Sequence, residues 1–377
     1  MAPLSSWCVS VNKKTDPNQL PVDGSVPAKI SAREAKSVVD DLFPLVPAIY
    51  WIDLLLSTTL AYGSAAFCLQ TANFSLQQGL AFVISGIALF RITTFMHEIA
   101  HMRRSEMRAF KLVWNLLVGI PLLTPSLFYT THADHHSNRH YGTPDDGEYL
   151  PFGATEPSTI FRFIAAIPFI PILAVIRALL LVPLSLLVPR LRIWLLARAS
   201  AAVINPTYKR RHAPKIWDPV WLVTDLACFA YTACAGALVL NGSLTLRTLG
   251  ILYALILFAI ALNWLRTLAA HRYRNSGREV SHTNQVLDSI NIIGSPLLTE
   301  FLYPVGLRYH ALHHLLPSLP YHALGKAHRR LMLVLPADSL YRQASCSSTV
   351  AALRQLWRDA KSSGDQGLAI RQQWRQT

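Results

Sequence analysis

Long apolar stretches separated by short polar links make up most of this chain. Residues 46–67, 78–96, 219–240 and 247–269 each contain about 20 mainly apolar residues, the length at which a helix crosses the hydrocarbon core of a bilayer. The pattern therefore predicts four transmembrane helices. Before the first of them, residues 31–43 predict either a short surface helix or a flexible arm.

Two further apolar stretches contain prolines. Residues 112–129 include Pro121 and Pro125, and residues 160–189 include four prolines together with Arg177. Proline lacks a backbone N–H and clashes with the preceding helical turn, so it interrupts a helix. We therefore expect both stretches to lie in the plane of the membrane or to re-enter it, without crossing.

The basic residues are distributed unevenly among the links. Residues 69–77 and 241–246 contain no Lys or Arg, whereas residues 97–111 contain four and residues 190–218 contain seven. Because short loops rich in Lys and Arg stay in the cytoplasm, both termini are expected there. Basic loops facing anionic headgroups then explain the net charge of +14 without nucleic-acid binding.

The composition agrees with this topology. A hydrophobic fraction of 52% with only 15% charged residues lies outside the ordinary soluble class. We expect an all-α integral membrane protein with about four transmembrane helices and a cytoplasmic helical cap. Its parts would be a cytoplasmic arm (1–44), a membrane domain (45–335) and a cytoplasmic tail (336–377). The charge asymmetry fits a bacterial inner membrane, which we favour, and also an endoplasmic reticulum membrane.

Eight of the fourteen histidines fall in three short clusters. The clusters are HEIAH with His97 and His101, HADHH with His132, His135 and His136, and HALHH with His310, His313 and His314. Residues three and four apart lie on one face of a helix, so each cluster directs two or three imidazoles toward one point. This is the geometry of metal ligands.

The positions of the clusters constrain the topology. His97 directly follows the second predicted helix and His271 directly follows the fourth, so both are expected at the cytoplasmic rim. A crossing at residues 112–129 would put His132 on the opposite face, so the metal hypothesis requires that stretch not to cross. With His271 the expected ligands number nine, which exceeds the three or four of one tetrahedral zinc site and predicts two metal ions. Imidazole suits Zn, Cu, Fe and Ni alike, so the ligand type leaves the metal open.

Acidic residues close to the clusters are candidates for orienting the histidines, because a metal-bound imidazole usually donates its second N–H to a carboxylate or carbonyl. Glu98 and Asp134 lie inside the clusters and are our first candidates. Asp145, Asp146 and Glu148 follow the second cluster, where a solvated acidic turn is an equally good interpretation. His282 competes with His271 as the ninth ligand.

The clusters in this order, with LLPSLPYHAL after the third, resemble the membrane fatty acid desaturase and hydroxylase superfamily over roughly residues 45–335. The resemblance implies a di-iron centre held by the histidine boxes, O2 as co-substrate and no catalytic residues beyond the metal centre. His271 stands where the acyl-CoA branch of that family has an additional histidine, although Thr267 replaces an asparagine of that branch.

The resemblance also implies the reaction. We expect a double bond to be introduced into a long acyl chain of a lipid with O2 and two electrons, and hydroxylation or ketolation of a lipid or carotenoid is the alternative. The sequence has no HPGG haem segment, so the electrons are expected from a separate donor of the ferredoxin, rubredoxin or cytochrome b5 type.

Two other classes of protein explain these motifs less well. HEIAH matches the HExxH motif of zinc proteases, but a protease would leave the other two clusters unexplained. A metal transporter should carry polar residues near the bilayer midplane, and the predicted helices contain little beyond Asp53, Asp225 and Asn263.

Overall fold

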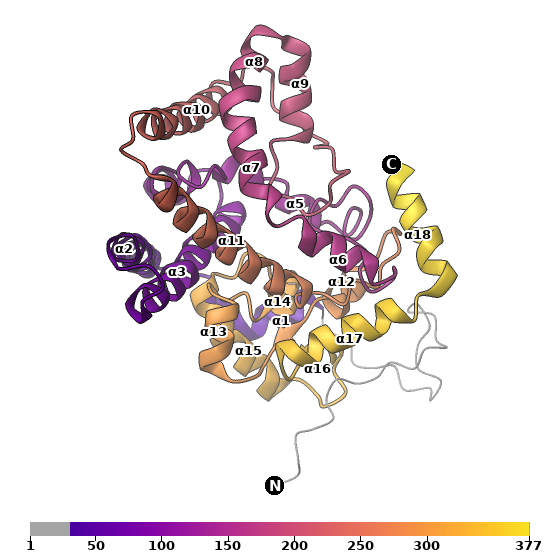
Figure 1. Ribbon diagram of the computed structural model, residues 1–377. Helices are drawn as coiled ribbons and strands as arrows, with labels where there is room; N and C mark the ends of the chain where they lie inside the picture. Colours follow the sequence, from indigo (N-terminus) through magenta and orange to yellow (C-terminus); the bar gives the residue numbers. More distant parts are fainter. Residues whose placement is uncertain (1–30, 377) are drawn as a thin grey trace. The chain divides into compact units, whose positions relative to one another are not determined.

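The computed structural model describes residues 31–376, which form a predominantly helical structure (Figure 1). Contacts divide the chain into two compact units, and each is described by itself. The membrane unit consists of residues 46–150 and 158–265, and the C-terminal unit consists of residues 31–45, 151–157 and 266–373.

The membrane unit is entirely helical in its regular structure. Its elements are α2 (Pro47–Gln70), α3 (Leu76–His101), α4 (Arg108–Trp114), η2 (Asn115–Gly119), η3 (Ser126–Tyr129), α5 (His132–His135), α6 (Ser158–Ala165), α7 (Phe169–Ile176), η4 (Arg177–Leu181), α8 (Val182–Leu187), α9 (Pro189–Arg198), α10 (Pro219–Leu240) and most of α11 (Leu246–Leu268). The predicted transmembrane segments correspond to α2, α3, α10 and α11, each long and apolar enough to cross a bilayer. The prediction of an all-α membrane fold is confirmed.

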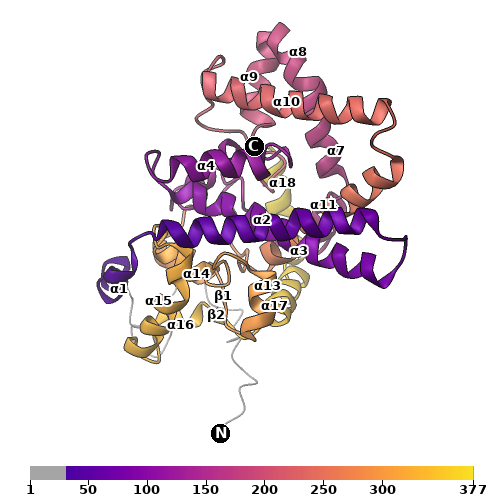
Figure 2. The same cartoon turned by 90° about the vertical axis from the view of Figure 1, so that its left-hand side faces the viewer.

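The two helices α2 and α3 lie side by side along their length (Figure 2). The hydroxyl of Ser75 accepts a hydrogen bond from the backbone N–H of Gln78 and so caps the start of α3. Between the helices, Arg91 Nε donates to Asp53 Oδ1 at 2.9 Å, which pairs the two charges inside these apolar segments. His97 and His101 lie at the C-terminal end of α3.

The proline-containing stretch 112–129 is broken, as predicted. The helix formed by α4 and η2 ends at Gly119, and turns follow over residues 120–125. Trp114 Nε1 donates to the carbonyl oxygen of Ile92 at 2.8 Å, so the segment packs along the second half of α3. It is too short to cross a bilayer and instead leads the chain to the second histidine cluster.

In the other stretch the helix breaks next to Pro168 and Pro189, as expected, but Pro171 and Pro183 do not interrupt it, contrary to our expectation. Residues Phe169–Leu187 form one continuous helix, which by length and composition is a fifth candidate span among the described residues. Pro171 lies in its first turn, where no N–H donor is needed. Before Pro183 the helix widens into the π-turn η4, in which the Val182 N–H donates to the Arg177 carbonyl five residues back, and this wider turn accommodates the proline ring.

The C-terminal unit combines short helices with one pair of two-residue strands. Its elements are α1 (Ala32–Val39), η1 (Asp40–Leu42), α12 (His282–Asp288), β1 (Asn291–Ile292), α13 (Pro296–Leu302), α14 (His310–Leu315), α15 (Tyr321–Val334), α16 (Leu340–Gln343), β2 (Ser345–Cys346), α17 (Thr349–Lys361) and most of α18 (Gly364–Gln376). Of the two alternatives for residues 31–43, the structure has the helix, which begins with a capping box between Ser31 and Glu34.

The parallel strands β1 and β2 lie in the core of the C-terminal unit. The buried residues around them are Ala269, Ile290, Ile292, Tyr303, Leu307, Cys346 and Ala352. The side chain of Asn291 in β1 accepts a hydrogen bond from the backbone N–H of Leu312 in α14 at 3.1 Å. The core therefore fixes the helix that carries the third histidine cluster.

Candidate metal centre

The first and second histidine clusters converge inside the membrane unit. The His132 ring lies 4.6 Å from that of His97, and the His136 ring lies 4.8 Å from that of His101. Each of these four side chains offers a nitrogen, and the four nitrogens lie within 4.8 Å of one another. His132 is therefore on the same side as His97, as the metal hypothesis requires.

Two carboxylates hold the outer nitrogens of the second cluster. Glu148 Oε1 lies 2.8 Å from His132 Nδ1, and Asp146 Oδ2 lies 2.9 Å from His135 Nδ1. A carboxylate on Nδ1 fixes the proton there and directs the Nε2 lone pair inward. His132 Nε2 indeed lies 3.0 Å from His136 Nε2.

A tight turn positions these carboxylates. Asp146 accepts hydrogen bonds from the backbone N–H groups of Gly142 and Glu148, at 3.0 and 2.8 Å. A Cβ atom on Gly147 would lie 2.4 Å from Val203 Cγ1, so the close packing of this turn on residues 203–205 requires glycine. Asp146 and Glu148 therefore belong to a packed turn, whereas Asp145 is exposed and pairs with Arg211, as the solvated alternative predicted.

The first candidates for orienting residues have other contacts. Glu98 Oε2 accepts a hydrogen bond from Tyr50 at 2.7 Å, and its other oxygen lies 3.8 Å from His97 Nδ1. Asp134 Oδ2 accepts a hydrogen bond from Tyr208 at 3.2 Å. Burial and the neighbouring Asp134 carboxylate raise the pKa of Tyr208, so this phenol stays protonated and donates.

The environment keeps His132 neutral. Burial lowers its pKa well below the ordinary value, and the adjacent imidazoles of His97 and His136 lower it further because a second positive charge would be close by. A neutral imidazole is the form that binds a metal ion, and protons compete poorly for this nitrogen near neutral pH.

A second group of histidines lies in the C-terminal unit. His310 Nε2 lies 2.9 Å from His271 Nε2 and 3.2 Å from His314 Nε2, and all three residues are buried. His310 and His314 are four residues apart on α14 and therefore share a face. His271 follows α11 and is held by an antiparallel bridge to Ser289.

Neutral groups hold the outer nitrogens here. The Ser289 hydroxyl donates to the Gln285 carbonyl at 2.9 Å, which leaves its oxygen to accept from His271 Nδ1 at 3.2 Å. The Gln285 side-chain amide lies 3.1 Å from His314 Nδ1. The amide oxygen and nitrogen of Gln285 can exchange places by a 180° rotation of the amide group. The oxygen then accepts the Nδ1–H of His314, which leaves the Nε2 lone pair of His314 directed toward His310.

Other histidines of this unit lie outside the group formed by His271, His310 and His314. His313 is buried, and its ring lies 6.0 Å from those of His310 and His314. His282 Nε2 contacts the backbone carbonyl of His314 at 3.1 Å, so His271 and not His282 joins the imidazole group. His328 on α15 lies 2.7 Å from the hydroxyl of Tyr341 on α16.

The donor sets fit metal ions. Facing Nε2 atoms about 3 Å apart repel unless a proton or a cation lies between them, and burial disfavours extra protons. Imidazoles with the outer nitrogen held by a hydrogen bond are the usual arrangement at a metal site. The structure therefore supplies two imidazole groups suited to divalent metals.

Sequence reasoning missed Ser289 and Gln285 because serine and glutamine carry no metal-site signal. Only the backbone bridge to His271 and the turn of α12 bring them to the histidines. Asp146 and Glu148 did have a signal, their closeness to the second cluster. The sequence alone did not separate that role from a solvent-facing turn.

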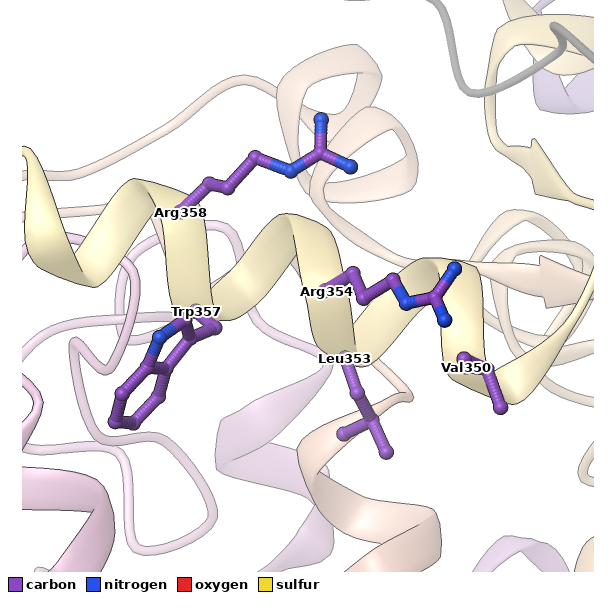
Figure 3. Close-up of a pocket in the computed structure, with 5 residues that line it drawn as sticks. All are labelled: Val350, Leu353, Arg354, Trp357 and Arg358. Atoms are coloured by element: carbon purple, nitrogen blue, oxygen red, sulfur yellow. The ribbon is translucent and has the colours of Figure 1, made fainter.

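A depression on the surface of the C-terminal unit does not take part in this chemistry. It has a volume of about 360 Å³ and is lined by Val350, Leu353, Arg354, Trp357 and Arg358, all on α17 (Figure 3). None of these side chains is a usual metal ligand. The histidine groups are therefore the candidate site.

An all-α membrane fold with clustered histidines that could hold metal ions is typical of a class of membrane oxidoreductases. The fatty acid desaturase family matches residues 74–345, and the chain belongs to this family. It is also 40% identical over 329 residues to a ceramide hydroxylase from Caulobacter vibrioides (strain NA1000 / CB15N), which covers 86% of this chain and 93% of that protein. This relative favours the hydroxylase alternative over the desaturation that we expected first.

Proposed function

We propose that this protein is a membrane oxygenase that hydroxylates a long chain of a ceramide-type lipid. The observation that carries the proposal is the 40% identity to a ceramide hydroxylase along nearly the whole of both chains. Identity at this level over the full fold supports a shared reaction more strongly than family membership, which includes desaturation. The buried histidine groups supply the ligands that such a reaction needs.

We propose that nine histidines bind two iron ions. They are His97, His101, His132, His135, His136, His271, His310, His313 and His314. Iron bound there would supply the activation of O2 and the cleavage of an unactivated C–H bond. Asp146 and Glu148 hold His135 and His132, while Ser289 and Gln285 hold His271 and His314. Glu98, through its bond to Tyr50, supports the end of α3, and Asp134 anchors Tyr208.

The overall reaction balances with O2, two electrons and two protons. One oxygen atom enters the C–H bond as a hydroxyl group, and the other leaves as water. The electrons would come from a separate donor protein of the ferredoxin, rubredoxin or cytochrome b5 type. The lipid would enter from the bilayer of a bacterial inner membrane, with the histidines and both termini on the cytoplasmic side.

Lipid analysis with isotopically labelled O2 tests the reaction. The protein is expressed in a bacterium that is supplied with a ceramide, and the lipids are compared with those of cells that express the His132→Ala variant. We expect a product that has gained one labelled oxygen atom, only with the unaltered protein. A product that has lost two hydrogen atoms and gained no label would establish desaturation instead.

The metal is tested separately. Iron and zinc are quantified in protein purified in detergent, for the unaltered chain, His132→Ala and His212→Ala. His212 is exposed and outside the clusters, so its variant is the matched control. We expect about two irons per chain, reduced only in His132→Ala. One zinc that is indifferent to His132 would support the protease class.

A further inference from the structure

The helix α17, which carries the surface depression, has no part in the metal chemistry but has a distinct pattern of side chains. It has 13 residues and a length of about 20 Å, which is too short to cross a bilayer. We propose that α17 lies along the membrane surface and binds anionic phospholipids there, with its apolar side chains among the acyl chains and its basic side chains at the phosphates. The evidence comes from the C-terminal unit alone and does not depend on the proposed function.

The buried face of α17 packs next to the end of a transmembrane helix. Its buried residues are Ala352, Leu356 and Ala360, which are four residues apart and share one helix face. Ala352 belongs to the same core cluster as Ala269, the residue that directly follows α11. Because α11 has the length and hydropathy of a membrane span, its end lies at the edge of the hydrocarbon. The core therefore holds α17 close to the membrane surface.

An apolar stripe runs along α17 beside its buried face. It consists of Val350, Leu353 and Trp357, which line the depression of about 360 Å³. Val350 is 54% exposed, and the other two side chains are partly exposed. Figure 3 shows Leu353 and Trp357 on one side of the helix and Arg358 on the other. A stripe of aliphatic side chains with a tryptophan is typical of helices that lie in a membrane interface.

A second exposed apolar surface adjoins α17. The helix α13 exposes Leu297, Leu298 and Phe301, by 72%, 62% and 48%. Tyr303, which follows α13, donates a hydrogen bond to the hydroxyl of Thr349 at the start of α17 at 3.0 Å. The end of one helix is thus tied to the beginning of the other. Exposed apolar side chains on two connected helices mark an interaction surface, and acyl chains match its chemistry.

Basic side chains border the apolar stripe of α17. They are Arg354, Arg358 and Lys361, all exposed. Asp359, the one acidic residue of α17, is bound to Arg274, whose Nη2 lies 2.7 Å from Oδ2. On α13 the one acidic residue, Glu300, lies 3.6 Å from Arg308. The acidic charges are therefore balanced, and an anionic leaflet attracts the three basic groups. Their methylene groups can lie along apolar surface while the charged ends reach the phosphates.

A lipid surface fits this combination better than a soluble protein does. An acidic protein would match the basic side chains, but it would also have to cover the apolar stripe. Acyl chains are already present where α11 leaves the membrane, and phosphates lie directly beside them. The order of apolar and basic stripes on α17 follows the order of acyl chains and headgroups in a leaflet.

Nitroxide probes in nanodiscs test the immersion of α17. Single cysteines replace Val350 and, as a control, Lys326 on the exposed polar side of α15, in a cysteine-free background that retains its bound metal. With phosphatidylglycerol present, we expect Val350→Cys to collide strongly with O2, which concentrates in hydrocarbon, and weakly with a water-soluble nickel reagent. Lys326→Cys should show the opposite ranking. High nickel access at Val350→Cys would overturn the proposal, and so would protection from both reagents, which indicates a protein partner or a second copy.

Brominated lipids test the preference for anionic headgroups. They quench a bimane fluorophore on Val350→Cys by contact, and we expect more quenching by phosphatidylglycerol than by phosphatidylcholine at the same fraction. Arg354→Gln/Arg358→Gln should lower this preference by about fivefold for each arginine. Lys326→Gln/Arg329→Gln removes two exposed charges from α15 and should leave it unchanged. Equal quenching by the two lipids before any arginine is replaced, or the same loss in both double variants, would overturn the phosphate contact.

Discussion

The two histidine groups have similar imidazole geometry but differ in what surrounds them. In the first group, the Glu148 carboxylate holds His132, whereas in the C-terminal unit a hydroxyl and an amide hold His271 and His314. A carboxylate adds negative charge that offsets the charge of a metal ion and makes the imidazole a stronger donor. A neutral partner only orients the ring. The first group is therefore built for stronger electrostatic stabilisation of a cation than the second.

Removing an imidazole from each group should have the largest effect. Loss of an orienting group typically lowers metal affinity or activity by about 10–100-fold. We expect the loss of a ligand in His132→Ala and His310→Ala to lower iron binding and hydroxylation by more than this. Iron content and product formation are measured for both, with exposed His212→Ala as the control. If either variant kept its full iron content, that group would not be a metal site.

Replacing the orienting groups should separate the two regions. Glu148→Gln keeps the shape but removes the charge next to His132, and we expect about 10–100-fold lower activity or metal affinity. Ser289→Ala removes a neutral hydrogen bond, typically about 0.5–1.5 kcal/mol, so about tenfold or less is expected. Chelator titrations of the iron-loaded proteins measure both. Equal losses would contradict the distinction between charged and neutral support.

A substitution that disturbs the packing of the carboxylate turn should have a smaller effect, which a second substitution should partly reverse. Gly147→Ala would bring a Cβ within 2.4 Å of Val203 Cγ1 and displace the turn that carries Asp146 and Glu148. Overpacking of this kind costs about 1–3 kcal/mol. We expect a lower melting temperature and weaker iron retention, both partly restored in the double variant with Val203→Ala. Without such rescue, the effect would not arise from this contact.

His328 provides a reference for a buried histidine outside both groups. Burial lowers its pKa to about 4, and nearby arginines contribute. Between about pH 6.5 and 4 the unfolded chain binds a proton there and the folded chain does not, so stability falls as the pH falls through this window. Thermal unfolding in detergent should show a smaller acid-induced drop in Tm for His328→Gln than for the unaltered protein. A drop of the same size in both would exclude His328 as the source.

The sequence by itself determined the long apolar helices and the candidate metal ligands. Four apolar runs of about 20 residues form helices because their backbone groups must be satisfied within the segment in a bilayer. The spacings in HEIAH, HADHH and HALHH place imidazoles on shared helix faces, a consequence of local geometry alone. The resemblance to the desaturase superfamily rested on the same residues and is confirmed.

Tertiary structure decided what local pattern could not. Whether Asp146 and Glu148 face solvent or histidines depends on packing of their turn against residues 203–205, about 60 positions later in the chain. Ser289 reaches His271 through a bridge between segments that share no motif. Prolines at 171 and 183 predict breaks, but a first-turn position and a π-turn absorb them, since the effect of proline depends on which N–H the helix needs.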